Sequence, residues 1–173
     1  MPAIATSRIK ASQEQIALLK QLLPPDAGGI HQLRYGLSAP GYNNGNLAAG
    51  LGTKPLVIPA SLEEQAFIRS VFDRLSQIIK IRAIQDNELT NPFQIVSVGR
   101  VRDDQGEPNI TGITYTSFRF LVKPSGERTV VPASSAITIE AELNDAPGLT
   151  NAEKRTLVHE IGHGIGLEHA DGN

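Results

Sequence analysis

Residues 159–169 read HEIGHGIGLEH, which has the spacing H-E-x-x-H-x-x-G-x-x-H and holds three of the protein's four histidines. His159 and His163 are four positions apart, so on a helix both imidazoles project from one face, one turn apart. Two imidazoles at that separation can bind one tetrahedral metal ion such as Zn2+. Glu160 follows the first histidine directly, which places its carboxylate beside the metal, where it can hold and deprotonate a water molecule.

The glycine at position 166 supplies the turn that the third histidine needs. Gly166 comes three residues after His163 and can adopt a positive φ at low cost, which ends the helix in a left-handed turn. The chain then doubles back, and His169 can reach the same metal. Three protein nitrogens and one open position describe a catalytic zinc site rather than a closed structural one. The simpler alternative is a histidine-rich helix end without metal, in which Gly166 would cost about 1 kcal/mol without a purpose.

A capping box upstream independently predicts that the first two histidines lie on a helix. Thr150 and Glu153 have the S/T-x-x-E spacing of this motif, so the helix is expected to begin there and to carry His159 and His163 two to three turns in. Its apolar residues give it a buried side: Leu157, Val158, Ile161 and Ile165.

The extended motif resembles that of the metzincin zinc endopeptidases at all five defining positions. Within this family, the sequence of residues 159–169 is most similar to the serralysin and matrixin branches. The resemblance implies a zinc-dependent endopeptidase in which His159, His163 and His169 bind the metal and Glu160 is the general base. It also implies an α+β fold: a twisted mixed β-sheet with a long backing helix and an active-site zinc helix packed beneath it.

Two features depart from the family pattern. Metzincins continue past the third histidine to a methionine-containing turn, whereas here the only methionine is Met1 and four residues follow His169. Serralysins usually carry proline and matrixins serine after the third histidine, and this chain has Ala170. We therefore expect residues 30–173 to form a catalytic domain that is incomplete at its C-terminus and lacks the C-terminal subdomain.

The order of elements before the zinc helix is similar to the upper subdomain of metzincins. Ser61 and Glu64 form another capping box, which predicts a long amphipathic helix from residue 62. Hydrophobic patterning and turn residues predict the following elements. They are a helix over 62–81 and strands over 30–37, 81–84, 93–101, 110–122, 128–131 and 136–143.

One predicted strand is a candidate for substrate binding. By the resemblance, an antiparallel edge strand pairs with an extended peptide through main-chain hydrogen bonds. The best candidate lies within residues 112–118, and the residues expected to contact substrate are Gly112, Ile113, Thr114, Tyr115 and Thr116. The alternative is a simple sheet strand, and the sequence does not separate the two.

Residues 1–29 are predicted to form an N-terminal helix and linker outside the catalytic domain. Residues 1–11 are small and polar and are expected to be loose. Ser12 and Gln15 fit a capping box for a helix over 12–23, which a proline pair and a Gly-rich linker end. This helix is either a short propeptide or a helix that packs on the domain.

Length, composition and net charge exclude several classes of protein. The chain has 173 residues, 40% hydrophobic and 20% charged, which suits one globular domain. A net charge of −2 gives no electrostatic case for nucleic acid or an anionic membrane, and no apolar run of eighteen residues could span a bilayer. There is no cysteine, so disulfides and thiolate ligands are excluded. A monomer is expected.

Calcium and export receive little support from the sequence. The loop over 38–54 contains asparagines but no carboxylate, so a calcium ion there is an option without support. Residues 1–20 lack the apolar core of a signal peptide, although the family resemblance favours a secreted protein.

Three functions remain open at this stage. The first is a zinc-dependent endopeptidase that acts on peptides or proteins. The second is a zinc-binding but catalytically inactive module that binds a peptide or a partner. The third is a globular domain without metal.

Overall fold

The protein has an α+β fold, as the sequence predicts. The computed structural model describes residues 10–11, 13–23, 25–37, 57–86, 93–99, 112–117, 120–131, 136–143 and 148–169. The helices are α1 (Gln13–Leu22), α2 (Leu62–Ser76) and α3 (Asn151–Gly164). The strands are β1 (Lys10–Ala11), β2 (His31–Leu37), β3 (Val57–Ile58), β4 (Ile81–Gln85), β5 (Phe93–Gly99), β6 (Gly112–Ser117), β7 (Phe120–Val122), β8 (Arg128–Val130), β9 (Ala136–Leu143) and β10 (Leu167–Glu168).

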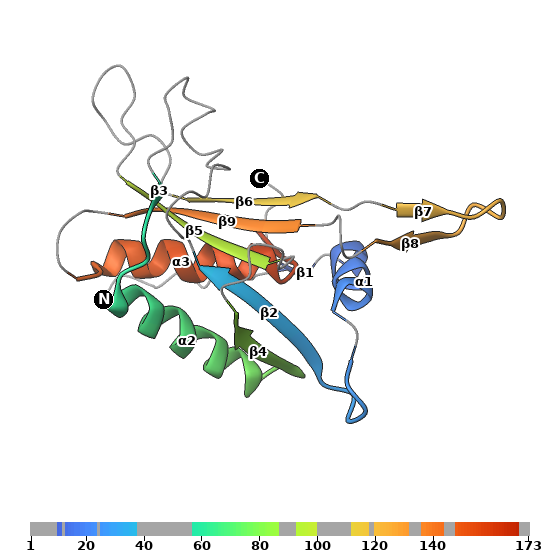
Figure 1. The fold of residues 1–173 in the computed structure, drawn as a ribbon, viewed down its shortest axis with the longest axis horizontal. Coiled ribbons are helices and arrows are strands. Elements are labelled where there is room, and N and C mark those ends of the chain that lie inside the picture. The colour runs from blue at the N-terminus through green and yellow to red at the C-terminus, as the bar shows by residue number, and fades with distance from the viewer. Residues whose placement is uncertain are drawn as a thin grey trace, which may run out of the picture.

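The main sheet is mixed and has the strand order β4-β2-β5-β9-β6 (Figure 1). The first four strands of this order run parallel to their neighbours, whereas β6 pairs antiparallel with β9 at one edge. Short β3 pairs antiparallel with the end of β5. The predicted mixed sheet is therefore confirmed, and residues 112–117 form its antiparallel edge strand in the part of the chain that the structure describes.

Helices α2 and α3 cover one face of this sheet (Figure 1). α3 packs against β9 and β6, and α2 packs against β4 and contacts α3. The core between the layers is made of fully buried side chains from both. They include Leu33, Ile68, Phe72, Phe93, Ile95, Ile137, Ile139, Leu157 and Ile161. This packing fixes α3, which carries His159 and His163, under the edge of the sheet.

Two of the three predicted capping boxes are present in the described part of the chain, at the starts of α2 and α3. The Ser61 hydroxyl accepts from the Glu64 amide at 3.1 Å, and the Thr150 hydroxyl accepts from the Glu153 amide at 3.2 Å. Glu64 is also tied to the sheet, because the hydroxyl of Ser97 in β5 donates to its carboxylate. Burial raises the pKa of Glu64. The capping box predicted at Ser12 lies outside the described residues.

Helix α2 is shorter than the sequence predicts. It ends at Ser76 rather than at residue 81, because the chain must turn back before Ile81 pairs with His31 in β2. Ile78 lies in this turn and is 75% exposed. The fully buried stripe of α2 is formed by Ile68 and Phe72.

The strand predicted over residues 110–122 is divided into two. β6 belongs to the main sheet, whereas β7 pairs with β8 in a separate hairpin around a turn at residues 123–127. Strands β1, β3 and β10 have two residues each and were not predicted, because two residues show no alternation of polarity. Among the described helices, none is long and apolar enough to cross a membrane.

Candidate metal centre

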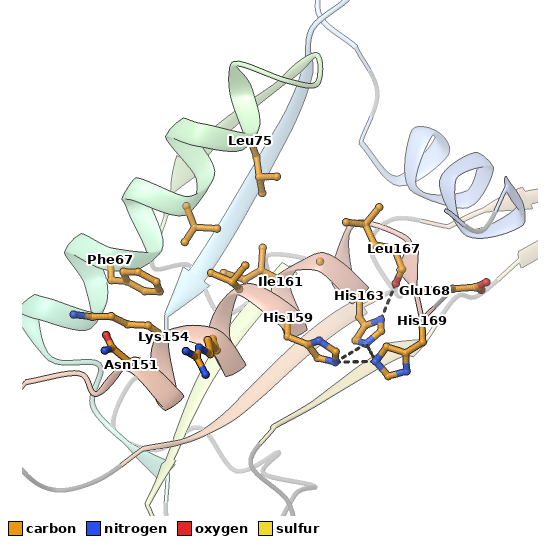
Figure 2. Close-up of a pocket in the computed structure, with 14 residues that line it drawn as sticks. Phe67, Leu75, Asn151, Lys154, His159, Ile161, His163, Leu167, Glu168 and His169 are labelled. Carbon is orange, nitrogen blue, oxygen red and sulfur yellow. Dashed lines mark hydrogen bonds between the residues drawn. The ribbon is translucent and has the colours of Figure 1, made fainter. Parts of the chain in front are cut away.

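The three histidines of the motif converge on one point. Their Nε2 atoms lie 3.0 Å apart between His159 and His163, 3.2 Å between His163 and His169, and 3.0 Å between His159 and His169. Figure 2 shows the three rings turned toward one another. The first two project from one face of α3, one turn apart, and the third follows β10 directly. The group could hold a metal ion.

The spacing of these nitrogens fits zinc. Three imidazole nitrogens bonded to one tetrahedral zinc at about 2.0–2.1 Å lie roughly 3.3–3.4 Å apart. The observed separations of 3.0–3.2 Å are close to that value. The Nδ1 atom of His163 lies 2.7 Å from the Leu167 carbonyl, to which it donates a hydrogen bond. This bond leaves the lone pair of a neutral imidazole on Nε2, as a metal ligand requires.

The turn after α3 brings the third histidine back to the helix. The helix ends at Gly164, and the amides of Ile165 and Gly166 donate to carbonyls of the last turn. Gly166 has a φ of 92°, in the left-handed region that favours glycine. β10 then runs back toward the helix, so that His169 faces His159 and His163.

The surroundings of His159 favour its neutral imidazole. His159 is exposed as a whole residue, yet loss of solvent around its ring is the main cause that lowers its pKa. The neighbouring ring of His163 lowers the pKa of His159 further, Glu160 opposes the shift, and His169 adds to it. A lowered pKa keeps the nitrogen lone pair available for a metal at more acidic pH.

Glu160 lies between the histidine cluster and the edge strand. Glu160 is buried, with 6% exposure. The Thr114 hydroxyl donates to Oε2 of Glu160 at 2.7 Å and lies 2.9 Å from the main-chain carbonyl oxygen of Glu160. Gly112 allows this close approach, since a Cβ there would lie 2.5 Å from the Thr156 methyl and 2.8 Å from the Glu160 Cγ. The sequence does not signal the contact between Thr114 and Glu160, because 46 residues separate them.

A cleft of about 470 Å³ runs between β6 and α3. It is lined by Gly112, Thr114 and Thr116 on one side and by Glu160 and the three histidines on the other. All five residues predicted to contact substrate lie in β6, and these three line the cleft, as the period of two along a strand requires. The side chains of Ile113 and Tyr115 lie outside the described part of the structure.

A second cavity, of about 600 Å³, lies on the other side of α3, toward α2. It shares the three histidines with the cleft and is otherwise largely apolar, with Phe67, Val71 and Leu75 contributed by α2 (Figure 2). Val158 lines it and is 47% exposed, so the prediction that this residue is buried is wrong. The reason is that the cavity separates α2 from this side of α3 and leaves Val158 uncovered.

Comparison with known proteins adds no assignment. No protein-family model matches the chain, and no curated protein matches it in sequence. The resemblance therefore rests on residues 159–169 and on the order of the elements around them.

Proposed function

We propose that this protein is a zinc-dependent endopeptidase of metzincin type, which hydrolyses peptide bonds in the cleft between β6 and α3. The convergence of three Nε2 atoms within 3.0–3.2 Å of one another carries the proposal. A set of three protein nitrogens leaves a coordination position open, which is the arrangement of catalytic rather than structural zinc sites. The carboxylate of Glu160 beside the cleft supports the same conclusion.

The donor set favours zinc over the hard cations. His159, His163 and His169 would hold the ion through their Nε2 atoms, and imidazole suits zinc, whereas calcium and magnesium prefer oxygen ligands. A zinc ion held there would supply Lewis-acid chemistry, which polarises a carbonyl and lowers the pKa of water.

Glu160 would serve as the general base and then as the acid. Its carboxylate takes a proton from the attacking water, whose oxygen bonds to the peptide carbon. It then passes that proton to the departing nitrogen as the carbon–nitrogen bond breaks, so that a carboxylic acid and an amine result. The Thr114 hydroxyl holds Oε2 at 2.7 Å, which would fix the carboxylate beside the cleft.

The edge strand would bind the substrate. In the described part of the chain, β6 is the last strand of its sheet, so its outer edge offers main-chain donors and acceptors. A peptide or an extended segment of a protein can add to that edge as a further strand. This placement would bring the scissile bond across the cleft that Glu160 and the histidines line.

The decisive test replaces Glu160 while leaving the metal ligands intact. In Glu160→Ala we expect zinc content equal to that of the wild type and cleavage of a quenched fluorescent peptide library reduced by about a hundredfold or more. Glu127→Gln is the matched control, because it changes an exposed carboxylate in the outer hairpin. Its cleavage rate should equal that of the wild type.

Other outcomes would point to other functions. Unchanged cleavage by Glu160→Ala would exclude the mechanism. A wild type that binds zinc and cleaves nothing would favour the alternative, a zinc-binding module that binds a peptide or a partner. A wild type without zinc, unaffected by His159→Ala, would favour a domain without metal.

A further inference from the structure

Strand β10 positions two of the three proposed metal ligands, His163 and His169. The carbonyl of Leu167 accepts the hydrogen bond from Nδ1 of His163 at 2.7 Å, which sets the ring orientation and tautomer of that ligand. The strand ends at Glu168, so the next residue is His169. A displacement of β10 would therefore move His169 and release the ring of His163 together.

The N-terminal segment holds β10 in place through its backbone. β1 pairs antiparallel with β10, with Lys10 opposite Glu168 and Ala11 opposite Leu167. In the described part of the chain these two strands form a sheet of their own, separate from the main sheet. Figure 1 shows β1 beside the C-terminal end of α3.

Helix α1 supports the turn that precedes β10. A Cβ at Gly166 would lie 3.2 Å from Cγ1 of Ile16 and 3.4 Å from Cδ1 of Leu19, so α1 packs directly on this turn. The helix is itself fixed to the body of the protein. Leu19 and Leu22 are buried, and the side chain of Gln21 accepts from the Val130 amide in β8 at 2.9 Å.

We propose that β1 and α1, residues 10–11 and 13–22, form an N-terminal clamp that positions His163 and His169 for metal binding. The proposal rests on the proposed zinc site and extends it to a segment more than a hundred residues away in the sequence. Ile16 is its principal positioning residue, because its side chain and its amide both lie against Gly166. Linkage requires the reverse effect as well, so a bound metal should stabilise the clamp.

The first experiment measures zinc affinity in the full chain by competition with a chromophoric chelator. Ile16→Ala removes the atom nearest to Gly166, and we expect zinc to bind about 10- to 100-fold more weakly, the usual cost of losing support for a ligand. Ile68→Ala is the matched control, since it makes the same substitution at a fully buried isoleucine of α2, outside the clamp. It should lower the stability of the protein and leave zinc affinity close to that of the wild type. Ile16→Val should restore most of the affinity.

Two results would overturn the clamp. One is equal zinc affinity in Ile16→Ala and the wild type, and the other is an equal loss in Ile16→Ala and Ile68→Ala, which would indicate a general effect of destabilisation. Because the readout is zinc binding, a wild type that binds zinc without cleaving peptides would contradict the endopeptidase and still test the clamp. A wild type that binds no zinc would overturn both.

The second experiment measures the reverse effect by hydrogen exchange. Addition of zinc should slow exchange of the amides of β1 and α1 by a larger factor than exchange of the amides of α2, which gain only the stabilisation of the whole protein. Equal protection of α1 and α2 would mean that zinc stabilises the whole protein without a specific link to the clamp. Ile16→Ala should reduce the protection of β1.

Discussion

At the scale of single residues, the Thr114 hydroxyl orients the carboxylate of Glu160, the proposed general base. Its one hydroxyl hydrogen faces both the Oε2 atom of Glu160, at 2.7 Å, and the main-chain carbonyl of the same residue, at 2.9 Å. Glu160 is otherwise enclosed by β6 and α3, where Gly112 leaves room for it. In the proposed mechanism, Thr114 would therefore be a positioning residue that acts through Glu160.

Removal of this hydroxyl should reduce activity while leaving zinc bound. In Thr114→Val, which keeps the shape of the side chain, we expect kcat to fall about tenfold or more, with zinc content unchanged. The physical reason is that the carboxylate loses the donor that fixes its rotamer. Thr114→Ser keeps the hydroxyl and should retain most of the wild-type kcat. Equal kcat values for the valine and serine variants would contradict this role.

At the scale of elements, two glycines of α3 show how closely the helix packs on the sheet. A Cβ at Gly164 would lie 2.8 Å from Cζ of Phe93 and 3.0 Å from Cδ1 of Ile139, both fully buried. Phe93 is further packed edge-on against Phe72, with ring centroids 6.2 Å apart, so it has little room to move. At Gly162 the nearest side-chain atom, from Leu167, would lie at an ordinary 3.5 Å.

Alanine at these two positions should therefore have opposite effects on stability. Gly164→Ala forces the helix away from the sheet and should lower the free energy of unfolding by about 1–3 kcal/mol. Gly162→Ala gains helix propensity without a clash and should raise it by up to about 1 kcal/mol. Urea unfolding of both variants checks the prediction. A stabilised Gly164→Ala would mean that α3 packs less tightly than the structure indicates.

At the scale of the whole molecule, metal binding should be coupled to folding. A zinc site formed only in the folded chain stabilises it by about 2.7 kcal/mol when free zinc is a hundred times its dissociation constant. We expect zinc to raise Tm in differential scanning calorimetry, and a chelator to reverse the rise. His169→Ala should show little response. A rise in Tm of equal size in that variant would indicate that zinc binds elsewhere.

The same zinc effect should depend on pH, because each ligand must be a neutral imidazole. The rise in Tm should shrink as the pH falls below about 6.5, where free histidine becomes protonated. Without metal, the pKa of His159 is lowered from its ordinary 6.5 by burial of the ring and by its neighbours. As the pH falls, His159 therefore takes up a proton in the unfolded chain before it does so in the folded chain. The neutral His159 thus favours the folded state fully above pH 6.5, and this contribution to the free energy of unfolding is lost as the pH falls.

The sequence alone determined most features that depend on local spacing. The interval of four between His159 and His163 follows from helix geometry, and the capping boxes at Ser61 and Thr150 mark where two helices begin. The glycine at 166 indicated the turn, and alternating apolar residues located most strands of the main sheet. Each of these signals lies within a few residues of the feature that it predicts.

Only the tertiary structure decided the contacts between segments far apart in the chain. It placed Thr114 on Glu160, left one side of α3 uncovered at Val158, and paired the two-residue strands β1 and β10. No local pattern encodes such contacts, because they depend on how whole elements pack and on which edge of the sheet each one reaches. The motif thus identifies the three histidines. The packing of α1, β1 and β6 around the site determines how the histidines and Glu160 are held.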